Sequence, residues 1–196
     1  MGARRFIAVW LAMGLAVWVT AAAAAQDTPD AALEPAAALP CREAAETAKP
    51  SRAQLARCDR AIAQRGLALP VRLAMLMNRG AGLLNAGKTE RAVQDFDLAV
   101  QAAPALAEAW INKGIAVTRL PGRLDEAVAL IGRGIELGPR DPARAYYARA
   151  QAQEAAGRLK DAMEDYGAAA RANPDWPAPA EELKRFRVER RKVLRG

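Results

Sequence analysis

The chain has 196 residues and a formal net charge of +7, and 52% of its residues are hydrophobic while only 5% are aromatic. Apolar content dominated by Ala favours helices with close backbone approach over a sheet sandwich, and the length suits one helical domain. The sequence contains no His and two Cys, which removes the commonest general base and excludes a complete tetrahedral zinc site.

The first 25 residues have the pattern of a signal peptide. Arg4 and Arg5 precede an apolar run that ends at Val19, and alanines at 21–25 supply a cleavage site near Ala25. The alternative is an uncleaved anchor, because residues 6–25 carry no charge and are just long enough to span a bilayer. We therefore predict a secreted, periplasmic protein, with an inner-membrane anchored protein as the alternative.

A flexible spacer is expected next, over residues 26–40, because this stretch is rich in Ala and Pro. Ordered structure is expected from Cys41, in a helical unit at 41–70. Its first helix should stop before Pro50 and its second should begin after Ser51, a good N-cap residue.

The two cysteines are Cys41 and Cys58. An even pair in an exported chain is more often a disulfide than two free thiols, so we predict that they are bonded. The bond would close a loop of 16 intervening residues. The chain-entropy model assigns such a loop about 3 kcal/mol of stabilisation.

Four residue columns then recur with a step of 35 residues. Each unit holds a small residue, a bulky one, a small one and a Pro: Ala92, Phe96, Ala99 and Pro104, then Ala127, Ile131, Gly134 and Pro139, then Ala162, Tyr166, Ala169 and Pro174. A period of this size indicates stacked helical repeats. A Gly breaks each unit into two helices, and a lone pair cannot bury its apolar stripe, so neighbouring pairs must stack.

This layout resembles the tetratricopeptide repeat, a helix-turn-helix unit of about 34 residues. The large residue of its first helix is matched by Leu76, Trp110 and Tyr146, and the small residue four positions later by Gly80, Gly114 and Ala150. The resemblance implies an all-α fold, an α-α superhelix built as a right-handed solenoid of antiparallel helix pairs. The repeats would cover 71–106, 107–142 and 143–176, after a degenerate unit at 41–70, in an exported protein of bacterial type.

Trp176, Pro177 and Pro179 are expected to form a rigid step, followed by a helix from Glu181 to Leu194, within a basic C-terminal cap at 177–196. From residue 181 onward the chain holds seven Lys and Arg against three Glu. Leu183 and Phe186 share a face, which fits the cap that an open repeat array requires. The alternative is contact with an anionic membrane surface or an acidic partner. After loss of Arg4 and Arg5 on cleavage, the rest of the mature chain is nearly neutral and lacks the broad basic face of a nucleic-acid-binding protein.

The resemblance places the candidate binding surface on the concave face made by the first helix of each pair, where the family binds extended peptides or partner helices. Asn78 and Asn112 occupy the place of an asparagine ladder, whose amides can hold a peptide backbone. The alternative is that Asn is merely tolerated on an exposed helix. The other candidates on this face are Met77, Ile111, Ile115, Arg119, Arg144, Tyr147 and Gln151. Met77 and Ala81 replace polar residues of the clamp that some members use for a terminal carboxylate.

No catalytic constellation is expected. Carboxylates such as Asp125 and Glu126 lie near the starts of second helices, where negative charge stabilises the helix dipole. We therefore predict a non-enzymatic adaptor that binds a peptide segment or helix of another protein, with no cofactor or metal. The alternatives are a membrane-tethered assembly factor and an accessory subunit of an envelope enzyme complex. The oligomeric state is left open.

Overall fold

A computed structural model describes residues 36–193 of the chain, with side chains through Phe186. Every regular element in this part is helical, and no described helix has the length and apolar character needed to cross a membrane. The predicted signal peptide, its cleavage site and residues 26–35 of the predicted spacer lie outside the described residues.

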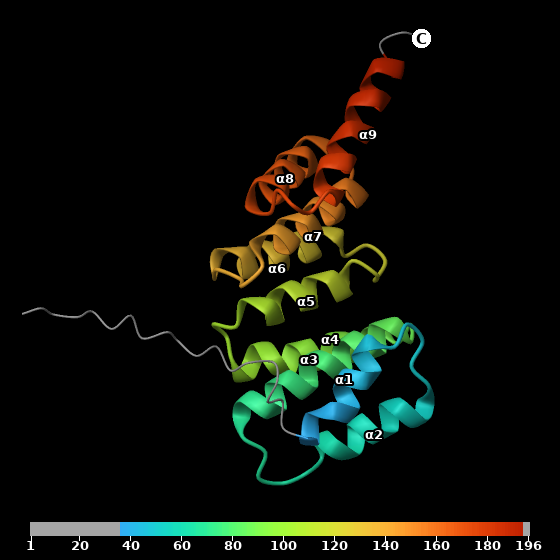
Figure 1. Cartoon of the computed structure of the whole chain (residues 1–196), viewed down its shortest axis with the longest axis vertical. Coiled ribbons are helices and arrows are strands. Elements are labelled where there is room, and N and C mark those ends of the chain that lie inside the picture. The colour runs from blue at the N-terminus through green and yellow to red at the C-terminus, as the bar shows by residue number, and fades with distance from the viewer. Residues whose placement is uncertain (1–35, 194–196) are drawn as a thin grey trace, which may run out of the picture. The chain divides into compact units, whose positions relative to one another are not determined.

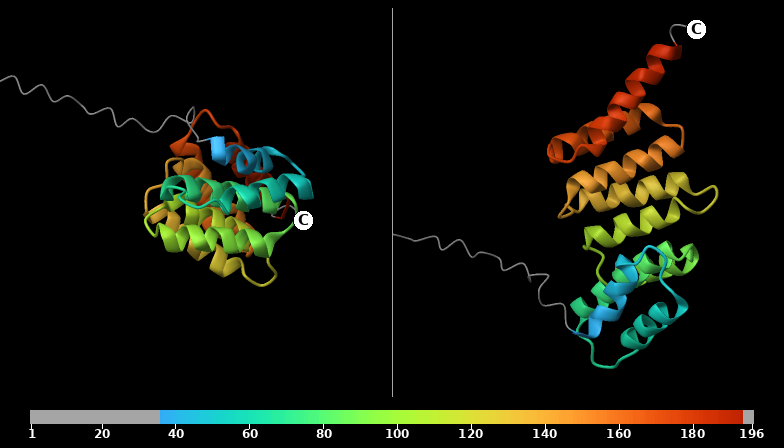
Figure 2. Two further views of the ribbon diagram at one scale, coloured as in Figure 1. Left: turned by 90° about the horizontal axis from the view of Figure 1, so that it is seen from below. Right: turned by 45° about the vertical axis from the view of Figure 1, so that its right-hand side comes forward.

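A short 3-10 turn, Ala36–Ala38, leads into helices that follow one another in pairs. The helices are α1 Leu39–Glu46, α2 Arg52–Ile62, α3 Leu69–Asn85, α4 Thr89–Ala102, α5 Ala107–Val117, α6 Leu124–Glu136, α7 Pro142–Ala155, α8 Leu159–Ala172 and α9 Ala178–Val193. Figures 1 and 2 show each helix lying beside the next along the chain, from α3 to α8. The predicted all-helical stack of helix pairs is confirmed.

The recurring columns form the contacts inside each pair. The small and bulky columns of the second helices are buried in all three repeats, at Ala92, Phe96, Ala99, Ala127, Ile131, Gly134, Ala162, Tyr166 and Ala169. A Cβ atom added to Gly80 would lie 2.6 Å from the Phe96 ring, and one added to Gly114 would lie 2.5 Å from Cγ1 of Ile131. Small residues in the first helices therefore allow the bulky residues of the second helices to approach the backbone.

The N-terminal unit begins earlier than predicted. Residues 36–40 were expected to be flexible, but they form the 3-10 turn and the start of α1. Pro40 fits here because the first turn of a helix does not need its missing N–H. Ala38 is fully buried beside both cysteines, so packing fixes this segment. The helix also ends at Glu46, where Thr47 adopts an extended backbone.

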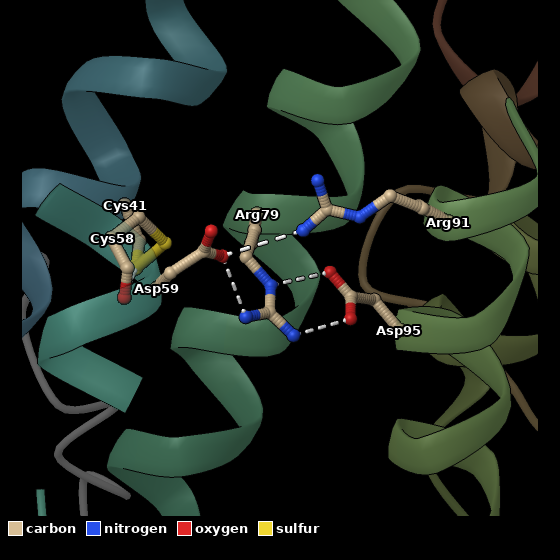
Figure 3. Close-up of a disulfide and its surroundings, with 6 residues drawn as sticks. All are labelled: Cys41, Cys58, Asp59, Arg79, Arg91 and Asp95. Atoms are coloured by element: carbon tan, nitrogen blue, oxygen red, sulfur yellow. Dashed lines mark hydrogen bonds and ion pairs between the residues drawn. A yellow bond between two sulfur atoms is a disulfide. The ribbon is translucent and has the colours of Figure 1, made fainter. Parts of the chain in front are cut away.

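A disulfide between Cys41 and Cys58 joins α1 to α2, as predicted, and both residues are fully buried (Figure 3). The second helix begins as expected at Ser51, whose side chain accepts from the amide of Gln54 while the Gln54 side chain accepts from the Ser51 amide. This reciprocal cap satisfies two N–H groups that a helix start otherwise leaves without partners.

Arg79 connects the N-terminal unit to the first repeat (Figure 3). Its guanidinium bonds both carboxylate oxygens of Asp95 on α4, at 2.8 and 2.6 Å, and Oδ1 of Asp59 on α2 at 2.9 Å. The hydrogen bond to Asp95 is the main reason that the pKa of Arg79 lies above its ordinary value. Asp59 also pairs with Arg91 at 3.6 Å. This network was not predicted from the sequence.

The third repeat repeats this pair at the same spacing. Arg149 bonds both oxygens of Asp165, at 2.6 and 2.8 Å, and only 8% of the Asp165 side chain is exposed. The middle repeat differs: the corresponding cation, Lys113, pairs with Asp97 of the preceding repeat at 2.5 Å. The position that would carry its buried acid is Leu130 once the extra turn residue is counted.

Helix α9 covers the third repeat and begins at Ala178, three residues before the predicted start at Glu181. Pro179 was expected in a rigid step before the helix; it lies instead in the first turn, where it is buried. Leu183 and Phe186 pack against the side chains of the third repeat, and the Phe186 and Tyr166 ring centroids lie 6.0 Å apart. The side chains described for this helix, through Phe186, therefore lie against the third repeat.

Candidate functional site

Two adjoining pockets lie along the first helices of the three repeats. The first, between α3 and the start of α5, has a volume of about 350 Å³, and the second, between α5 and α7, about 380 Å³. Glu108 and Arg140 line both pockets. Together the pockets form a groove that crosses both junctions between repeats, and we call it the first-helix groove.

The first pocket is mainly apolar. Pro70, Leu73, Ala74 and Met77 line it from α3, and Leu106 lines it from the turn before α5. Helical spacing brings the four α3 residues to one side of that helix. The turn is held by its own hydrogen bonds, because the Trp110 indole donates to the Pro104 carbonyl at 2.9 Å and the Leu106 amide donates to the Ala103 carbonyl at 2.9 Å. This pocket suits an apolar side chain.

The second pocket combines an apolar floor with polar walls. Ile111, Ile115 and Ala145 supply apolar surface, Asn112 supplies an amide, and the turn before α7 supplies Pro139, Arg140, Asp141 and Arg144. Gly138 has a φ of +74°, a left-handed conformation that ends α6 and directs the chain into this turn. The Asp141 side chain then caps α7 by accepting from the Arg144 amide at 3.0 Å.

The carboxylates of the groove are engaged by groove donors. Oε1 of Glu108 accepts from the backbone amide of Arg140 at 3.0 Å. Oδ1 of Asp141 accepts the capping bond, and Oδ2 pairs with Nε of Arg144 at 3.1 Å. The Arg140 guanidinium makes no ion pair with the described residues, and the Arg144 side chain is 80% exposed. Guanidinium N–H donors are therefore available at the groove rim.

Five of the nine predicted binding residues line this groove: Met77, Ile111, Asn112, Ile115 and Arg144. Ile111 is only 7% exposed, so it forms floor more than contact surface. Asn78, Arg119 and Gln151 do not line either pocket. The guanidinium of Arg119 instead donates to the Leu84 carbonyl at 2.7 Å. The predicted ladder of Asn78 and Asn112 is thus represented in the groove by Asn112.

Tyr147 was predicted on the same face, but the structure places it in the contact with the C-terminal cap. Its hydroxyl donates to Oε1 of Glu182 at 3.3 Å, and its ring lies 4.8 Å from Trp176 and 5.2 Å from Tyr166, between centroids. Burial, and next the charge of Glu182, raise the pKa of Tyr147 above its ordinary value. Helix α9 covers this part of α7, so Tyr147 is not part of the first-helix groove.

Several groove residues were not predicted, including Leu73, Leu106, Glu108 and Arg140. They lie near the starts of helices or in the turns between repeats. The predicted binding residues lie mostly in the middle of the first helices instead. The sequence does contain a pattern that points to two of them. Leu106 lies two residues after the recurring Pro104, and Arg140 directly follows the recurring Pro139.

Residues 143–175 match the family described as "Tetratricopeptide repeat". The third helix pair is therefore similar to a tetratricopeptide repeat. This match confirms the predicted helical repeat for that one helix pair. No group of three His, Cys, Asp or Glu in the described part of the chain could hold a metal ion. No curated protein matches the chain significantly.

Solved structures share the stacked fold at low identity. The MamA fragment from Desulfovibrio magneticus RS-1 is 20% identical with a TM-score of 0.60, covering 81% of this chain and 88% of its own. The first tetratricopeptide domain of Spaghetti (RPAP3), bound to the HSP90 peptide SRMEEVD, is 22% identical with a TM-score of 0.55, covering 63% and 96%. YrrB, described as having an unusual peptide-binding site, is 19% identical with a TM-score of 0.56, covering 67% and 64%.

Proposed function

We propose that the protein is an adaptor that binds an extended peptide segment or a helix of another protein in the first-helix groove. The observation that carries this proposal is the pair of adjoining pockets, with apolar floors and exposed hydrogen-bonding groups at their rims. A preformed groove on packed helices lowers the cost of ordering the binding surface. Two proteins of this fold, Spaghetti (RPAP3) and YrrB, are described with a bound peptide or a peptide-binding site.

Two kinds of group in the groove would contact the ligand, namely apolar side chains and a hydrogen-bonding amide. Leu73, Met77 and Ile115 offer partly exposed apolar surface, which gains free energy when a ligand side chain covers it. Asn112 offers an amide donor and acceptor, which can bond a peptide backbone in either direction. Binding by this surface needs no chemical step, only complementary shape and hydrogen bonding.

We further propose that the adaptor works outside the cytoplasm, after export and cleavage near Ala25. The support is the Arg4 and Arg5 pattern followed by an apolar run, together with a disulfide between Cys41 and Cys58, because such bonds persist in oxidising compartments. A membrane-tethered assembly factor is the rival proposal. N-terminal sequencing of protein recovered from cell fractions separates them, since a chain that starts at Gln26 excludes the tether.

The groove is tested by photo-crosslinking in cells from a reactive residue at position 112. Position 129, an exposed Ala on the second helix of the same repeat, provides the matched control. We expect position 112 to capture a protein that position 129 does not capture. The Asn112→Ala and Ile115→Ala double variant should lose that protein while keeping its helical circular dichroism.

Capture of the same proteins from both positions would contradict the proposed function. So would unchanged capture when a reactive residue at position 74, on the wall of the first pocket, is combined with the double variant. Both readings depend only on the described helices and not on how the N-terminus is processed.

A further inference from the structure

Arg140 has a position in the groove that no other described cation shares. It lines both pockets, and it lies in the turn between α6 and α7. Its backbone amide is used by Glu108, but its guanidinium makes no ion pair with the described residues. The arginines at the core of the flanking repeats behave differently, because Arg79 and Arg149 are each held by a carboxylate in bidentate fashion.

The carboxylates near Arg140 accept hydrogen bonds from groups other than its guanidinium. Asp141 uses both oxygens on Arg144, one on the backbone amide and one on the side chain. Glu108 uses one oxygen on the Arg140 amide. The groove thus has equal numbers of arginines and carboxylates, but its unengaged hydrogen-bonding capacity lies mainly with guanidinium donors, which favour carboxylate acceptors.

We propose that the groove selects an extended segment in which an acidic side chain follows or precedes a large apolar one by a few residues. This inference rests on the proposed function and specifies the ligand of the same site. The apolar side chain occupies the first pocket, against Leu73, Met77 and Leu106. The carboxylate binds Arg140, with Arg144 close enough along α7 to line the same second pocket.

The position of Arg140 indicates whether the bound carboxylate belongs to a side chain of the ligand or to its C-terminus. Because Arg140 lies where the two pockets join, a ligand that fills both pockets passes Arg140 in the middle of its length. The group that it meets is then a side chain and not the end of the ligand. An extended chain advances about 3.3 to 3.6 Å per residue, so adjoining pockets correspond to ligand positions only a few residues apart.

The test is selection from a library of random 12-residue segments, displayed between fixed flanking sequences so that no segment has a free end. The full chain serves as the target. We expect enrichment of sequences with Asp or Glu within about four residues of Leu, Ile, Met or Phe, in keeping with that extended spacing. In an enriched peptide, replacing the acid by its amide should weaken binding about tenfold, as expected for loss of a charge-assisted hydrogen bond.

Arg140→Gln should weaken the acidic peptide by a similar factor and remove the difference between the acidic and amide peptides. The substitution leaves the backbone bond to Glu108 in place, so the fold of the turn is preserved. Arg133→Gln, at an exposed arginine of α6 paired with Glu136, is the matched control and should change nothing.

Each other outcome contradicts either this inference alone or the proposed function as well. Enrichment of Lys and Arg, or equal binding of the acidic and amide peptides, overturns the inference while leaving the groove as the binding site if Asn112→Ala with Ile115→Ala still abolishes binding. Binding that survives this double variant, or a library without any enrichment, overturns the proposed function as well.

Discussion

The middle repeat and the repeats on either side of it build the same helix pair with different interiors. The flanking repeats place an aromatic residue, Phe96 or Tyr166, in the bulky column, and each buries an Arg–Asp pair beside it. The middle repeat places Ile131 in that column and uses two close glycine contacts, at Gly114 and Gly134. The first repeat has one such glycine contact, at Gly80, beside its ion pair, whereas the middle repeat has two and no buried Arg–Asp pair.

This difference relates to the groove. The middle repeat supplies residues to both pockets, and the flanking repeats each supply residues to one. Its first helix is only 11 residues long, and its interior is formed by small and aliphatic side chains. The flanking repeats contact the disulfide-bonded unit at one end and α9 at the other, through Arg79 and Tyr147 respectively. Arg79 and Tyr147 thus join the flanking repeats to the two ends of the stack, while the middle repeat links the two pockets of the candidate site.

The largest expected effect comes from removing the aspartate of a buried Arg–Asp pair in one of the flanking repeats. Asp165→Ala leaves Arg149, with a side chain 25% exposed, without its bidentate partner and should lower the free energy of unfolding by about 3 kcal/mol. Asp95→Ala should cost less, because Arg79 keeps its bond to Asp59. Urea unfolding followed by circular dichroism measures both values.

A double variant tests whether the unpaired charge of Arg149 causes this loss of stability, by giving the third repeat an apolar pair in place of its ion pair. The double variant Arg149→Met with Asp165→Leu replaces the pair by apolar side chains and should recover most of the loss, since such replacements are often near neutral. If the double variant were as unstable as Asp165→Ala, the unpaired charge of Arg149 would not be the cause of the lower free energy of unfolding.

The next effect concerns the interlocked glycines of the middle repeat. A Cβ atom at Gly134 would overlap Cγ1 of Ile111 and approach the Ala107 carbonyl oxygen to 2.8 Å. Gly134→Ala should therefore destabilise the protein by about 2 kcal/mol, in the range of overpacked cores. Thermal unfolding by calorimetry gives the difference.

Gly132, two residues earlier in the same helix, is the matched control. A Cβ atom there would approach nothing nearer than Nη1 of Arg149, at 3.6 Å. Gly132→Ala should stabilise the protein by about 0.5 to 1 kcal/mol through helix propensity. Equal effects at the two positions would contradict the interlocking contact.

The smallest effect is a dependence on alkaline pH that belongs to the third repeat. Burial and the bond to Glu154 raise the pKa of Tyr166 above its ordinary value of 10.0, whereas the middle repeat has Ile131 in this column. Above pH 10 the folded state keeps a proton that the unfolded chain loses, so the free energy of unfolding falls as pH rises. The fall approaches about 1.4 kcal/mol per pH unit for one tyrosine.

Urea unfolding at pH 8 and at pH 11 measures this dependence. Tyr166→Phe should be less stable at pH 8, because it lacks the hydroxyl bond to Glu154 at 2.9 Å, but it should lose less stability between the two pH values. An unchanged loss in the variant would assign the alkaline effect to other groups.

The sequence predicted the parts of the fold that repeat. Columns such as Ala92 and Phe96 recur because each pair must bury the same stripe, so their spacing carries the architecture. The ends of the stack were predicted less well, since Pro40 and Pro179 were taken as boundaries although a proline is accepted in a first helical turn. Nothing in a single sequence states whether such a proline precedes or begins a helix.

The candidate site was predicted in part for a similar reason. Ile111, Asn112 and Ile115 lie in the middle of a first helix, where the resemblance directs attention, and they line the second pocket. Arg140 and Leu106 lie in turns whose direction depends on the packing of neighbouring repeats. Tyr147 was misplaced because only the docking of α9 decides which side chains of α7 stay accessible.

The cap formed by α9 also covers a surface on which a further repeat could otherwise stack. An uncovered last repeat would present Tyr147 and Tyr166 to solvent, and a repeat surface of this kind accepts another repeat. Phe186, Leu183 and the bond from Arg185 to Glu154 at 2.6 Å occupy that surface instead. The outer surface of the last repeat is thereby occupied by a helix of a different kind, so a further repeat cannot stack on it while α9 is in place.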